Sequence, residues 1–125
     1  MTAGLIAFLR ARLDEDEAAA RAAKPGPWSA DGGAVYGIHP TDGVVDYSES
    51  AAHIARHDPA RVLAEVEVKR ALLELHHEVE DPQEMQDFCA ACDVTGTYPE
   101  YPCRTLRLLA LPYSSHPGYD ESWRP

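Results

Sequence analysis

The stretch DPARVLAEVEVKRALLELHHEV, residues 58–79, determines the fold that we expect for this chain. Asp58 is a good N-cap, and Pro59 suits the first helical position, where its missing N–H costs nothing. Apolar residues then recur at three- and four-residue spacing, as they do along one face of a helix. The stretch therefore predicts a long helix over residues 58–79.

Helical phase separates the two histidines near the end of this stretch. At roughly 100° per residue, His76 falls between two apolar arcs, whereas His77 lies nearer the polar margin. His76 is therefore expected to point into the fold. Glu65 and Lys69, at positions i and i+4, also lie between the arcs and are expected to pair with each other. The arcs consist of Val62, Val66 and Leu73, and of Val68, Leu72, Leu75 and Val79.

All three cysteines of the chain follow this helix. Cys89 and Cys92 form a Cys-x-x-Cys motif, whose spacing lets one tight turn aim two thiolates at the same ion. Cys103 comes next, after a turn-rich segment. Zinc prefers a tetrahedral set of three sulfurs and one imidazole nitrogen, and His76 is the best candidate for the nitrogen. The sequence predicts one structural zinc ion bound by these four residues in a loop over 76–103.

Other arrangements of the same residues stay open. His77 or His116 could replace His76, and the cysteines could be reduced and unligated. A thioredoxin-like redox pair is disfavoured because the motif runs into a glycine turn rather than opening a helix. Catalytic zinc is disfavoured because four protein ligands leave no open position for water.

Shorter elements surround the long helix and the cysteines. Leu5, Leu9 and Leu13 recur along one face of an N-terminal helix that we expect over residues 2–23. Two short runs, AVYGI and VVDYS, flank a turn that contains Asp42 and Gly43, and they predict a hairpin or meander over residues 34–48. Cys103 should begin a short helix over 103–111, where the helix dipole favours a thiolate. With an aromatic tail over 112–125, these elements predict an α+β, mainly helical fold in a single domain, 1–125.

Charge and hydropathy limit the partners and the location of the protein. Its formal charge is -10, from 21 acidic and 11 basic residues. This excess opposes direct binding to nucleic acid, and another protein is the expected partner. No segment approaches the roughly 18 apolar residues of a membrane span. The N-terminus carries charges where a signal peptide would stay apolar, so we expect a cytoplasmic protein with reduced cysteines.

Two alternative functions stay open. His53 and His57 lie at i and i+4, but they lack the glutamate of the protease motif HExxH. With the aromatic residues of the tail they could form a small-ligand site or the active site of an enzyme. Alternatively, His57 helps the turn before Asp58, and the aromatics complete the core. A weaker alternative is an acidic mimic of nucleic acid. The tail aromatics are Tyr113, Tyr119 and Trp123.

The Cys-x-x-Cys motif and residues 5–23, 25–28, 53–70, 102–113 and 116–125 together cover nearly the whole chain. In these segments the chain resembles a short uncharacterised family of Streptomyces-type actinobacteria and their phages. This resemblance implies a shared metal site at His76, Cys89, Cys92 and Cys103, and a role in interaction with other proteins or as a phage-related accessory. The family has no established activity that the resemblance could carry over to this chain.

Overall fold

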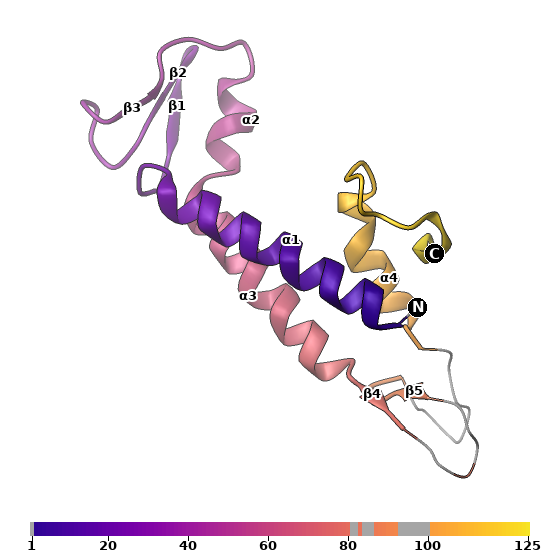
Figure 1. The fold of residues 1–125 in the computed structure, drawn as a ribbon. Coiled ribbons are helices and arrows are strands. Elements are labelled where there is room, and N and C mark those ends of the chain that lie inside the picture. Colours follow the sequence, from indigo (N-terminus) through magenta and orange to yellow (C-terminus); the bar gives the residue numbers. More distant parts are fainter. Residues whose placement is uncertain (1, 81–82, 84–86, 93–100) are drawn as a thin grey trace. The chain divides into compact units, whose positions relative to one another are not determined.

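The structure is a computed structural model that describes residues 2–80, 83, 87–92 and 101–125 (Figure 1). Helices dominate it and two small antiparallel sheets complete it, which confirms the predicted α+β class. Parts of the predicted loop over 76–103 lie outside the described residues. The helices are α1 (Thr2–Ala22), α2 (Ala51–Arg56), α3 (Pro59–Leu75) and α4 (Arg104–Ala110), with 3-10 turns η1 (Leu111–Tyr113) and η2 (Glu121–Trp123). The strands are β1 (Ser29–Asp31), β2 (Ala34–Tyr36), β3 (Gly43–Val45), β4 (Glu78–Val79) and β5 (Phe88–Cys89).

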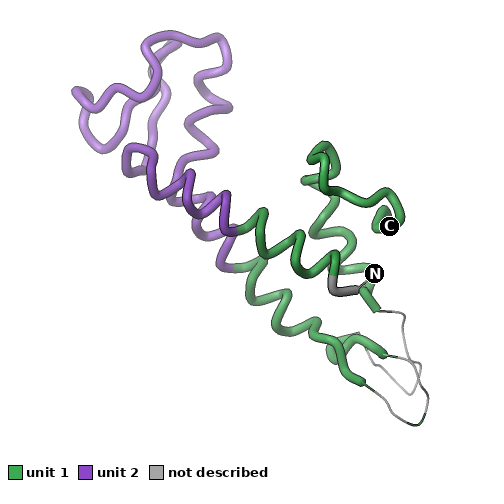
Figure 2. The backbone as a smooth tube through the Cα atoms, in the orientation of Figure 1, with its two compact units in different colours: residues 1–13, 68–125 green, residues 14–67 purple. Residues whose placement is uncertain are grey.

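The chain divides into two compact units (Figure 2). Unit 1 comprises residues 1–13 and 68–125, and unit 2 comprises residues 14–67. Each of the long helices α1 and α3 contributes residues to both units. The predicted metal ligands belong to unit 1, and the histidine pair His53 and His57 belongs to unit 2.

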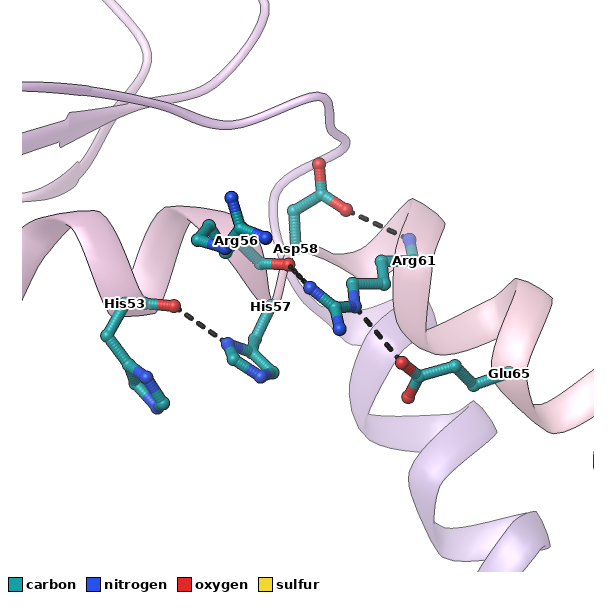
Figure 3. Close-up of polar contacts among 6 residues, drawn as sticks. All are labelled: His53, Arg56, His57, Asp58, Arg61 and Glu65. Carbon is teal, nitrogen blue, oxygen red and sulfur yellow. Dashed lines mark hydrogen bonds and ion pairs between the residues drawn. The ribbon is translucent and has the colours of Figure 1, made fainter.

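Asp58 starts α3 as the sequence predicts. Its Oδ1 accepts a hydrogen bond from the backbone N–H of Arg61 at 2.9 Å (Figure 3). Its Oδ2 accepts a second bond from the backbone N–H of Trp28 at 3.1 Å. One carboxylate therefore caps α3 and ties the chain that leads into β1 to the same point.

The end of α3 differs from the prediction. The helix ends at Leu75, and Glu78–Val79 form β4 instead of a final helical turn. The strand pairs antiparallel with β5, and the backbone N–H of Ala90 donates to the carbonyl of His77 at 2.9 Å. Pairing with a distant segment satisfies these backbone groups, so the helical pattern of the sequence is overridden there.

Two further details of the predicted helix are wrong. Val68 and Leu75 lie on one of the predicted apolar arcs of the helix, but in the structure they are 58% and 60% exposed. The predicted pair of Glu65 with Lys69 is replaced by an ion pair between Glu65 and Arg61, with the Nε and Oε1 atoms 3.0 Å apart (Figure 3). Lys69 instead lies 5.4 Å from the ring centroid of Tyr113. Glu65 thus pairs with another residue four positions away, and the ammonium group of Lys69 contacts an aromatic ring.

Unit 2 contains the predicted meander with one additional strand. The strands pair in the order β1-β2-β3, and α2 packs against β1 and β2. Asp31 pairs with Ala34 across a two-residue turn in which Gly32 has φ of 60°, a value that suits the primed hairpin turns. Val35 is fully buried at the centre of this sheet.

Aromatic residues of the tail complete the core of unit 1. Phe8 of α1 has four aromatic neighbours in the tail, and its ring centroid lies 5.1 Å from that of Trp123. Trp123 is buried, together with Leu5 and Leu9 of α1 and Leu106 of α4. Arg12 Nη1 lies within hydrogen-bond distance of the His116 ring. The tail therefore has a packing role in this unit.

No helix in the described part of the chain is both long and apolar enough to cross a membrane.

The double role of Asp58 leads to a prediction about stability. Asp58→Ala removes the helix cap and the tie to Trp28, so the free energy of unfolding should fall by about 1–2 kcal/mol. Urea denaturation followed by circular dichroism measures this loss. The matched control is Asp46→Ala, because Asp46 is exposed and has no hydrogen bond or ion pair among the described residues. Equal losses for the two variants would contradict the capping role.

Candidate metal centre

Four side chains of unit 1 come together at the end of α3. They are His76, Cys89, Cys92 and Cys103, and their nitrogen and sulfur atoms all lie within 4.8 Å of one another. Within the described residues these four form the one group of metal-ligating side chains that could hold an ion. The structure therefore brings together the four residues that the sequence singled out.

Helix α3 sets the position of His76. The backbone N–H of His76 donates to the carbonyl of Leu72 at 2.9 Å, which continues the helical pattern one residue past Leu75. The side chain of His76 therefore points in the direction that the helical pattern predicts. His77 is exposed, and its Nδ1 pairs instead with the carbonyl of Glu74 at 2.9 Å.

The hairpin of β4 and β5 carries the first two thiols. Cys89 ends β5 and pairs across the hairpin with Glu78, so it comes close to the end of α3. The backbone N–H of Cys92 donates to the carbonyl of Cys89 at 3.2 Å, closing a turn that directs both thiols to one side. This hairpin was not among the predicted elements, because two-residue strands are too short to show a periodic pattern.

Helix α4 carries the third thiol. Cys103 is its N-cap in an extended conformation, and its carbonyl accepts a bond from the backbone N–H of Arg107 at 3.1 Å. Its side chain is 3% exposed, and that of Cys89 is fully buried. The four candidate ligands thus come from the end of α3, from β5 and the turn that follows it, and from the N-cap of α4, three parts of unit 1.

The separations of the ligand atoms fit a tetrahedral ion. His76 Nδ1 lies 3.3 Å from the sulfur of Cys89 and 3.5 Å from those of Cys92 and Cys103. Ordinary zinc bond lengths place nitrogen and sulfur about 3.6 Å apart at adjacent corners of a tetrahedron. The three measured distances are close to this value, and all involve the same ring nitrogen. The residues present therefore fit a metal ion bound through Nδ1.

Two of the three thiols, those of Cys92 and Cys103, have raised pKa values. Burial raises the pKa of Cys92 to about 12, with further contributions from its hydrogen bond to Cys89 and from the nearby charges of Cys103 and Cys89. Burial also raises the pKa of Cys103, although the backbone amide of Leu106 opposes the shift. A divalent cation among the sulfurs reverses this balance, because it stabilises thiolates directly. All three cysteines are free of disulfide bonds.

An acidic pair lies on the same hairpin. A hydrogen bond with Asp87 raises the pKa of Glu78 to about 7, and burial and repulsion from Asp87 add to the shift. Neither carboxylate belongs to the group of four ligands. The ligand set is therefore three sulfurs and one nitrogen, without oxygen.

The other candidate residues lie elsewhere. His57 is exposed, and its Nδ1 pairs with the carbonyl of His53 at 2.8 Å, so it closes the end of α2 before Asp58 (Figure 3). The rings of His53 and His57 are 4.4 Å apart. His116 contacts Arg12 and the backbone of Gly118. None of these three histidines belongs to the four-residue group among the described residues.

Fold and site together define a small α+β protein with a four-residue His and Cys cluster. The model of a family of unknown function (DUF6221) matches residues 2–125, so the chain belongs to this family. No curated protein and no solved structure matches the chain.

The difference between the two adjacent histidines can be measured. His76→Ala removes the nitrogen that contacts all three sulfurs, so the variant should retain much less metal than the wild type after dialysis. His77→Ala is the matched control and should retain as much metal as the wild type. Elemental analysis of the two variants gives the ranking, and a greater loss for His77→Ala would refute the assignment.

Metal uptake should depend on pH because the thiols must lose their protons. The raised pKa of Cys92 means that this thiol is neutral in the metal-free protein at neutral pH. The apparent affinity should therefore fall with decreasing pH, by about tenfold per pH unit for each thiol deprotonated on binding. Competition with a chromophoric chelator at several pH values measures the slope. An affinity independent of pH would exclude thiolate ligation.

Proposed function

We propose that this is a small protein in which one structural zinc ion stabilises unit 1, and that it acts as a protein-interaction or accessory module. The observation that carries the zinc proposal is the convergence of three sulfur atoms on His76 Nδ1, at 3.3 to 3.5 Å. Such a set would link the end of α3, the β4–β5 hairpin and the start of α4.

The ligand types favour zinc over other ions. Calcium and magnesium prefer oxygen ligands, whereas thiolates with an imidazole are a common set for zinc. A set of four protein ligands is closed and leaves no position for a substrate or a reactive water. The proposed role of the ion is therefore structural, and its binding free energy adds to the stability of the fold.

Surface chemistry supports the interaction part of the proposal. Among the described residues, five large apolar side chains are exposed, and the chain as a whole has a formal charge of -10. A cytoplasmic setting would keep the thiols reduced and available to the metal. An accessory role in actinobacteria or their phages rests on the sequence resemblance alone. The exposed apolar residues are Ile38, Tyr47, Val68, Leu75 and Leu108.

Small-ligand binding is the second candidate, and a groove in unit 2 supports it. The groove has a volume of about 580 Å³, and Trp28, Arg56 and Arg61 supply its aromatic and basic side chains. Neither His53 nor His57 lines it. A ligand here would bind through the indole and the guanidinium groups rather than through the histidines.

The zinc proposal predicts about one zinc ion per chain in protein purified without added metal. Cys103→Ser removes a ligand and should lower the melting temperature by at least several degrees, because the binding free energy is lost from the folded state. Elemental analysis and calorimetry measure the two quantities. A chelator should lower the melting temperature of the wild type but change that of Cys103→Ser little. Metal-free wild-type protein would contradict the proposal.

A further inference from the structure

A row of apolar side chains on α3 in unit 1 lies largely outside the core. Val68 and Leu75 are 58% and 60% exposed, Ala71 is exposed, and Leu72 is half-buried. Their spacing of three, four and seven residues places them on one face of the helix. We call these four residues the α3 stripe.

The core-facing side of α3 is a different one. Leu73 is buried, and Lys69 lies over the ring of Tyr113. Successive residues of a helix are about 100° apart, so this side lies well away from Val68 and Leu75. Leu73 also lines a pocket together with Ile6 and Ala7 of α1. The α3 stripe is therefore not the surface that holds α3 in unit 1.

The pattern of the stripe matches a known mode of recognition. Anchors at positions i, i+3, i+4 and i+7 are those through which two helices, or a helix and a groove, bury apolar surface. Removal of such surface from water is the main driving force of association. The metal ligand His76 directly follows Leu75, so an ion at this centre would also fix the end of the stripe.

Charge decides between the possible occupants. The exposed Glu74 lies beside Leu75 at the edge of the stripe, and the chain carries a formal charge of -10. Two copies of such a chain repel each other, which opposes self-association. A partner with basic residues beside its apolar anchors is instead attracted and oriented by this charge.

We propose that the α3 stripe of Val68, Ala71, Leu72 and Leu75 docks an amphipathic helix of a partner protein, with lysine or arginine beside its apolar face. This inference names the kind of partner for the interaction role proposed above and rests on that role. The apolar anchors supply the affinity, and the exposed Glu74 together with the net negative charge of the chain disfavours acidic helices.

The test uses the full chain and two synthetic helical peptides. Both carry leucines at helical spacing, and the remaining positions are lysine in one peptide and glutamate in the other. The lysine peptide should bind with saturable heat in titration calorimetry, and the glutamate peptide should not. Binding of the glutamate peptide as tightly as the lysine peptide would overturn the charge argument.

Variants separate the stripe from general attraction to an acidic protein. The double variant Val68→Ser, Leu75→Ser should weaken binding of the lysine peptide at least tenfold. Its control, Leu108→Ser, alters an exposed leucine outside the stripe and should change the affinity less than twofold. Glu74→Lys should weaken binding several-fold more than Glu80→Lys, which changes the net charge equally. The proposal would be overturned if the double variant weakened binding no more than Leu108→Ser, or if Glu74→Lys weakened it no more than Glu80→Lys.

Two further measurements distinguish the remaining outcomes. A wild-type dimer in sedimentation that the double variant abolishes would show that the stripe pairs copies of this chain, and would overturn the proposal. Zinc content is measured on every variant. Stripe-dependent binding by a protein without metal would refute the structural zinc and leave the docking surface standing. Normal zinc content without peptide binding would refute the docking surface alone.

Discussion

The convergence of three thiols on one imidazole nitrogen is the arrangement on which the proposed stability of unit 1 depends. Cys89 and Cys103 are buried, and burial raises the pKa of Cys92 and that of Cys103. A bound ion would stabilise thiolates here and would link the end of α3, the hairpin and α4. The strands of that hairpin are two residues each, and so short a pair contributes little stability by itself.

In unit 2, one carboxylate connects two segments of the chain. The carboxylate of Asp58 accepts bonds from the backbone N–H groups of Arg61 and Trp28, and so joins the start of α3 to the chain that enters the sheet. Arg61 in turn contacts Glu65 and the carbonyl of Arg56. A local network of charge-assisted bonds therefore organises this unit without any metal ligand.

The proposed metal centre, which would be closed, and the exposed apolar face of α3 are compatible with a protein-interaction role. The centre would use all its ligands for stability, which leaves the surface to provide function. On α3 the two features are adjacent in sequence, since His76 follows Leu75 directly. Stability at the end of the helix would thus help to present the face beside it, because a frayed last turn would disorder the Leu75 anchor.

Local sequence patterns were enough to predict the start of α3, the Cys-x-x-Cys turn, the N-cap position of Cys103 and the inward placement of His76 rather than His77. Each of these follows from interactions between residues a few positions apart, such as capping, tight turns and helical phase. The tertiary structure alone decided where α3 ends, how β4 pairs with β5, and that Val68 and Leu75 face outward. These features depend on which distant segment packs against which side of the helix. Periodicity in the sequence indicates that a helix has an apolar face, but it does not indicate which segment covers that face.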